Sequence, residues 1–101
     1  MDDFPNADQV ATAIVEAARL TGENPQLCAL ARGGLRCRAI AMEALCLAFP
    51  TARRPGLARC VGYPKAAAFH GWLASAKRAS WWREEWVDEV VGALIGEDVA
   101  A

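Results

Sequence analysis

Apolar residues recur along the chain at helical spacing, and glycines and prolines divide the sequence into short segments. Near the N-terminus, Val10, Ile14, Val15 and Ala18 lie at intervals that place them on one face of a helix. No segment shows the β-branched runs with a period of two that are typical of strands. The pattern therefore predicts an all-α fold, a compact bundle of about five to six helices.

Capping residues and helix breakers set the boundaries of these helices. Asn6 or Asp8 can cap the first helix and Gly22 can end it, while Asn24 and Pro25 open a short second helix. The chain has 101 residues, without repeats or a long linker, which predicts a single domain spanning residues 1–101. The predicted helices cover about residues 8–20, 25–31, 35–49, 55–61, 65–77 and 81–95, the last one capped by Ser80.

Two of the predicted helices, residues 55–61 and 65–77, have the pattern of a helix-turn-helix. They are short, and a turn of three residues that begins at Gly62 joins them. Glycine can adopt the positive φ that an abrupt turn often requires, and the small Ala58 lets the second helix cross closely. The sequence predicts a helix-turn-helix at about residues 55–77. Helices joined by a glycine turn are also common in other helical bundles, so this pattern alone leaves DNA binding open.

Charge adds the most to this picture. The net charge is only −1, but residues 32–83 carry ten bases and one acid, whereas residues 1–31 sum to −4 and residues 84–101 to −6. A block of +9 is typical of a face that binds a polyanion. Charge alone favours equally a solvated surface on which the oppositely charged blocks neutralise each other.

The chemistry of a catalytic or metal site finds little support. The chain has one histidine, no pair of carboxylates with a partner base and no glycine-rich phosphate loop. We therefore expect that the protein is not an enzyme and that it binds no cofactor and no small-molecule substrate. The cysteines at 28, 37, 46 and 60 lack C-x-x-C spacing, which disfavours a metal site. We expect all four to be buried, reduced and structural.

The tryptophans cluster within fifteen residues. Trp72, Trp82 and Trp86 fall on core stripes of their predicted helices, so we expect them in the core. Trp81 lies off that stripe, at the start of an acidic last helix. It either caps the core or forms a partner surface with the neighbouring carboxylates.

One helical segment resembles a known family. The string R-C-R-A-I-A-M at residues 36–42 resembles the R-x-R-Q-[IM]-A-M helix of the C-terminal DNA-binding domain (domain IV) of the DnaA replication initiator, a helix-turn-helix of the Trp-repressor type. Pattern-level likeness extends over about residues 7–95. The resemblance implies that Arg36 reaches the minor groove and Arg38 contacts phosphate. It also implies that the turn and recognition helix bring five residues near base edges: Tyr63, Lys65, Ala66, Ala67 and His70. Arg32, Arg53 and Arg54 of the same basic block complete the expected DNA-binding set.

The chain departs from that family where the family reads its site. The family carries G-G-R-D-H-T-T at the turn and recognition helix, whereas residues 62–68 here are G-Y-P-K-A-A-A. The family glutamine after the second arginine is Ala39, and the ATPase module that normally precedes the domain is absent from this sequence. The initiator's own site and origin opening are therefore not expected.

The resemblance and its departures together predict a stand-alone, sequence-specific regulator of transcription that binds double-stranded DNA. We expect an activator at phage-like or gene transfer agent promoters, working with a second regulator or RNA polymerase. No apolar run reaches the roughly 18 residues of a membrane span, and the acidic start lacks the pattern of a signal peptide. We therefore expect a cytoplasmic, nucleoid-associated protein without membrane contact. The alternative is an interaction adaptor that keeps the fold and does not bind DNA.

Overall fold

The computed structural model describes residues 4–29, 35–63 and 69–96, and the regular structure within these ranges is entirely helical. In chain order, the described elements are α1 (Ala7–Thr21), the 3-10 helix η1 (Pro25–Ala29), α2 (Leu35–Ala48), α3 (Arg54–Cys60), α4 (Phe69–Lys77) and α5 (Glu84–Ile95). The radius of gyration is 12.3 Å, close to the roughly 13 Å expected for a folded chain of about 100 residues. The predicted class, a compact all-α bundle, is confirmed.

Helix α1 begins and ends where its sequence signals predict. The Asn6 side chain accepts a hydrogen bond from the Gln9 backbone N–H (2.8 Å), and the Gln9 side chain accepts one from the Asn6 backbone N–H (2.9 Å). This reciprocal capping box satisfies two donors that the first turn would otherwise leave unpaired. At the other end, Gly22 adopts φ 78° and its N–H donates to the Ala18 carbonyl. Glycine tolerates this left-handed conformation, so the helix stops there.

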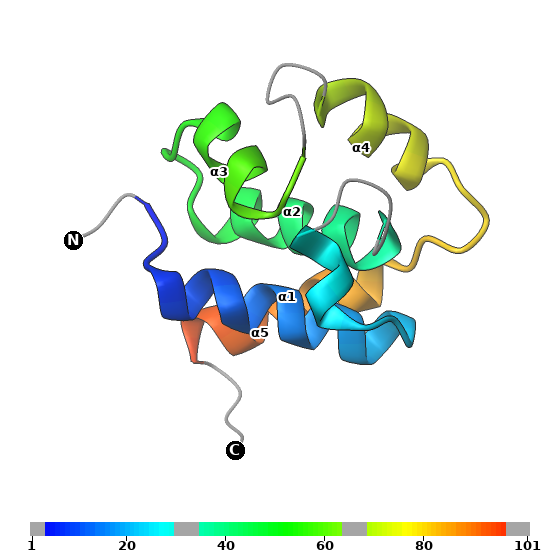
Figure 1. Cartoon of the computed structure of the whole chain (residues 1–101), viewed down its shortest axis with the longest axis horizontal. Helices are drawn as coiled ribbons and strands as arrows, with labels where there is room; N and C mark the ends of the chain where they lie inside the picture. The colour runs from blue at the N-terminus through cyan, green and yellow to red at the C-terminus, as the bar shows by residue number, and fades with distance from the viewer. Residues whose placement is uncertain (1–3, 30–34, 64–68, 97–101) are drawn as a thin grey trace.

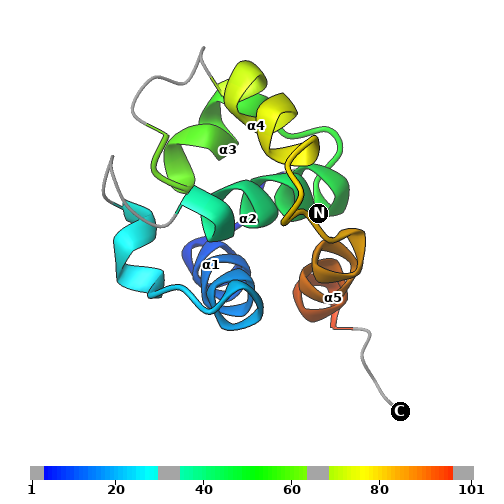
Figure 2. The same cartoon turned by 90° about the vertical axis from the view of Figure 1, so that its right-hand side faces the viewer.

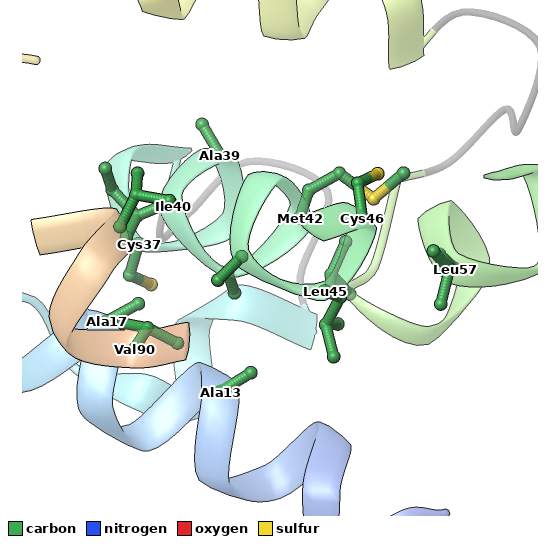
Figure 3. Packing of buried hydrophobic residues seen from close by; sticks show 14 of the residues in the cluster. Ala13, Ala17, Cys37, Ala39, Ile40, Met42, Leu45, Cys46, Leu57 and Val90 are labelled. Atoms are coloured by element: carbon green, nitrogen blue, oxygen red, sulfur yellow. The ribbon is translucent and has the colours of Figure 1, made fainter. Parts of the chain in front are cut away.

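Helix α2 lies at the centre of the bundle, with α1 and α5 on one side of it and α3 and α4 on the other (Figures 1 and 2). Its buried side chains point in several directions, as expected of a helix that is covered by neighbours on more than one face. Below α2 in Figure 3, Ala13 and Ala17 of α1 and Val90 of α5 pack toward it, and Leu57 of α3 belongs to the same buried cluster. Ala13 and Ala17 are fully buried, and their small size allows the helices to approach closely.

The segment after α3 turns sharply at Gly62, which has φ 92°. The backbone N–H of Tyr63 then donates to the Ala58 carbonyl (3.0 Å), which ties the turn to α3. Leu57, Ala58 and Val61 are buried beside α2. Residues 64–68 lie outside the described ranges, so the predicted helix-turn-helix stays a prediction.

Helix α5 begins at Glu84, three residues later than predicted. Trp81 and Trp82 pack against the core in the preceding turn, and the Trp82 indole N–H donates to the Glu84 carboxylate (2.8 Å). Arg83 is the N-cap residue, and its guanidinium donates to the carbonyls of Ser80 and Trp82. Packing of the two indoles thus overrides the Ser80 capping signal. Trp81 takes the core-capping position, one of the two alternatives that its sequence context left open.

Candidate nucleic-acid interface

Exposed bases gather on α3, α4 and the residue that precedes α3. Arg53 and Arg54 flank the start of α3, Arg59 lies in its last turn, and Arg78 directly follows α4. His70 is exposed near the start of α4. We call these five residues the basic side. The sequence between residues 44 and 83 contains no aspartate or glutamate, so α3 and α4 carry no acid of their own.

The arginines of the basic side are free of ion pairs within the described part of the chain. Only four ion pairs are seen there, and on this side of α2 the one cation that takes part is Lys77, whose Nζ lies 3.1 Å from a Glu43 carboxylate oxygen. Arg53, Arg54, Arg59 and Arg78 therefore keep their hydrogen-bond donors directed to solvent. Such donors are suited to phosphate oxygens.

The acidic residues of the last helix do not cover these bases. Glu84, Glu85, Asp88 and Glu89 are exposed on α5, and α5 lies on the far side of α2 from α3 and α4 (Figures 1 and 2). Glu89 instead pairs with Arg19 of α1, at 3.2 Å. The exposed α5 carboxylates are thus separated in space from the arginines of the basic side, which favours a polyanion face over neutralisation of these arginines by α5.

Arg36, which the resemblance assigns to the minor groove, is exposed at the start of α2 and is held by Glu23. One oxygen of the Glu23 carboxylate lies 3.5 Å from the Arg36 Nε, and the other accepts the Cys37 backbone N–H at 2.7 Å. A carboxylate at this position satisfies a free N–H of the first turn and complements the positive end of the helix dipole. Glu23 therefore already provides a carboxylate partner for Arg36 in this structure.

Arg38 and Tyr63 are the two assigned contact residues that the structure contradicts. Arg38 is fully buried (0% exposed), and Tyr63 is 6% exposed. The Cζ of Arg38 on α2 lies 5.5 Å from the centre of the Tyr63 ring, which follows α3. Neither side chain can reach phosphate or a base edge from there, so we remove both from the set of contact residues.

The structure brings the remaining candidates to two separate places. Arg36 is at the start of α2, whereas Arg53 and Arg54 follow its end, and a helix of 14 residues is about 20 Å long. Arg32, Lys65, Ala66 and Ala67 lie outside the described residues.

Two exposed bases of this face, Arg59 and Arg78, were missing from the predicted site. Both belong to the basic block that the sequence shows between residues 32 and 83. Arg59 sits two positions after the buried Leu57, on the opposite face of α3. The helical period applied to α3 could have placed Arg59 on the solvent side.

The cysteines differ from the prediction in two ways. Cys46 is buried with a free thiol, as expected, but Cys60 is exposed and Cys37 is disulfide-bonded. The side chain of Cys28 lies outside the described part. Burial raises the pKa of the Cys46 thiol, and partial desolvation raises the pKa of the exposed Cys60 thiol, which makes both poor nucleophiles at neutral pH. Among the described residues, no three histidine, cysteine or acidic side chains gather as metal ligands would.

No family model, no curated protein and no solved structure matches the chain. None of the helices in the described ranges combines the length and the apolar character needed to cross a bilayer. The function must therefore be argued from the arrangement of the residues themselves.

Proposed function

We propose that this protein binds double-stranded DNA in a sequence-specific manner and regulates transcription. The observation that carries the proposal is the separation of charge across α2. Unpaired arginines populate the α3 and α4 side, and exposed carboxylates populate α5 on the other. An extended polyanion is attracted to the first side and repelled by the second, so the field of the molecule orients it on DNA.

The likeness of residues 36–42 to the DnaA DNA-binding domain supports the same proposal. It places Arg36 at the minor groove and α4, whose first described turn exposes His70, at the major groove. Because the residues at positions 63–68 differ from that family, the target differs from the initiator's site. A partner regulator or RNA polymerase would then bind the side that faces away from DNA. The proposed targets are phage-like or gene transfer agent promoters.

The first test is titration of the purified protein on DNA at several salt concentrations, with sites taken from immunoprecipitation and sequencing of bound genomic DNA. Each phosphate contact adds about −0.9 to the slope of log affinity against log salt, so five or six contacts give roughly −4 to −6. Arg36→Ala and Arg54→Ala should each weaken binding, Arg36→Ala more so, and each should make the slope shallower by about 0.9.

Arg19→Ala is the matched control, because it removes the same charge from the acidic side, where Arg19 is held by Glu16 and Glu89. It should leave both affinity and slope unchanged. Absence of binding at low salt, together with absence of enriched genomic sites, would reject DNA binding. The interaction adaptor would then replace it.

A further inference from the structure

A buried cation and two aromatic rings connect α2 to α4. The guanidinium carbon of Arg38 lies 5.5 Å from the centre of the Tyr63 ring. The Tyr63 ring in turn lies 5.3 Å from the Trp72 ring, centre to centre, with 35° between their planes. These distances are typical of a cation–π contact followed by an offset aromatic pair.

Tyr63 is also tied to α3. Its backbone N–H donates to the Ala58 carbonyl, at 3.0 Å, while its ring contacts Arg38 of α2 and Trp72 of α4. One residue therefore contacts α2, α3 and α4. Any rotation of α4 relative to α2 would have to break the ring contacts.

The burial of these groups makes the contacts strong. Removing a guanidinium from water is costly, and the face of an aromatic ring offers it a partly negative environment that strengthens when water is excluded. Arginine stays charged when buried because its pKa begins far above neutral pH. Burial also raises the pKa of Tyr63 to about 12, so its ring stays neutral at physiological pH.

We propose that Arg38 is a positioning residue that fixes the orientation of α4 through Tyr63 and Trp72, and so controls DNA affinity without touching DNA. This rests on the proposed DNA-binding function. A recognition helix that is held in one orientation can bind DNA without first being ordered. If the helix has the correct orientation in only a fraction of the molecules, the apparent DNA affinity falls to that fraction of its full value. The exposed Arg36, two residues earlier on α2, serves the opposite role of direct contact.

The test separates the two roles by substituting methionine, an unbranched side chain that is shorter than arginine and carries no charge. In the free protein, Arg38→Met should shift the indole N–H resonance of Trp72, assigned by its loss in Trp72→Phe, and leave the other three indole signals nearly in place. Arg36→Met should not move it. With DNA, Arg38→Met should lose about tenfold in affinity with an unchanged salt slope, whereas Arg36→Met should make the slope shallower by about 0.9.

The conservative variant Arg38→Lys keeps a cation under the ring and should recover most of the affinity. A shallower salt slope for Arg38→Met would show direct phosphate contact and overturn the proposal. So would an unchanged affinity, because Arg38 would then have a purely structural role. If the wild-type protein binds no DNA, the proposed function fails, and the Trp72 resonance still decides whether Arg38 positions α4.

If Arg38→Met does not fold, Trp72 is substituted instead. It is the member of this contact that is 44% exposed, so its substitution should leave the fold intact. Trp72→Phe keeps an aromatic face for Tyr63 and should retain affinity. Trp72→Leu removes that face and should lose affinity severalfold with the salt slope unchanged. Equal affinities of the two variants would overturn the proposal.

Discussion

The two sides of α2 differ in packing and in charge. On one side, α1 and α5 bury alanines and valines against α2, and their exposed acids pair with Arg19 or face solvent. On the other, α3 and α4 bury few large side chains, among them Leu57 and Leu73, and expose arginines without acidic partners. Repulsion between the like charges of the second side lowers the stability of the fold, and a bound polyanion would relieve it. Under the proposed function, α1, α2 and α5 form the scaffold, and α3 and α4 carry the binding surface.

The largest expected effect tests the scaffold by comparing two leucine-to-alanine substitutions on α2, one at a buried position and one at an exposed position. Leu45 of α2 is 0% exposed and Leu47 is 54% exposed. Leu45→Ala should lower the free energy of unfolding by about 3 kcal/mol, because it leaves a cavity between packed helices. Leu47→Ala should change it by less than about 0.5 kcal/mol. Urea unfolding followed by circular dichroism measures both, and similar losses for the two variants would contradict the assigned core.

A somewhat smaller effect concerns the link to the binding surface and depends on pH. Burial raises the pKa of Tyr63 to about 12, above the value of about 10 of an unfolded chain. The protonated phenol is therefore favoured by folding. This contribution is complete below pH 10 and is lost between pH 10 and 12, at a total cost of about 2–3 kcal/mol.

Tyr63→Phe is the control for this titration, since it cannot lose a phenolic proton. The difference in unfolding free energy between wild type and Tyr63→Phe should be constant below pH 10. Above pH 10, the wild type should lose stability relative to Tyr63→Phe. The chain has one tyrosine, so absorbance of the phenolate reports Tyr63 directly. A phenolate that forms near pH 10 in the folded protein would show that the ring is not buried.

The smallest effect concerns the place where scaffold and binding surface compete. Glu23→Gln removes the charge beside Arg36 and at the start of α2, while keeping an acceptor for the Cys37 N–H. Stability should fall by about 0.3–1 kcal/mol through the helix dipole. DNA affinity should rise by about twofold to fivefold, because Arg36 no longer has to leave a carboxylate.

Glu89→Gln provides the comparison, since it frees Arg19 on the acidic side by the same change. It should not alter DNA affinity. If Glu23→Gln binds DNA no better than wild type, the contact of Glu23 with Arg36 does not compete with phosphate.

Local signals predicted the helices well where a cap or a breaker decided the boundary. Asn6 and Gly22 act as predicted, because capping depends on a few neighbouring backbone groups. The start of α5 was misplaced, since packing of Trp81 and Trp82 outweighed a serine cap. Trp72 was assigned to the core and is half exposed, because its indole stacks on Tyr63 at the edge of the bundle.

The candidate site was predicted less well than the fold. Arg36, Arg53, Arg54 and His70 are exposed as contact residues must be, but Arg38 and Tyr63 are buried. A buried arginine is rare, so composition and charge count it as a surface base. Only the positions of α3 and α4 over α2 show that this charge faces a ring.

The sequence by itself determined the helical class, the caps of α1, the turn at Gly62 and the order of acidic and basic blocks. These depend on periodicity and on contacts between residues near one another in the chain. The tertiary structure decided which bases are available. It placed Arg38 under Tyr63, Arg36 beside Glu23, and the acids of α5 away from the arginines of α3. Those outcomes depend on which helix faces cover one another, a property that arises only when segments distant in sequence pack together.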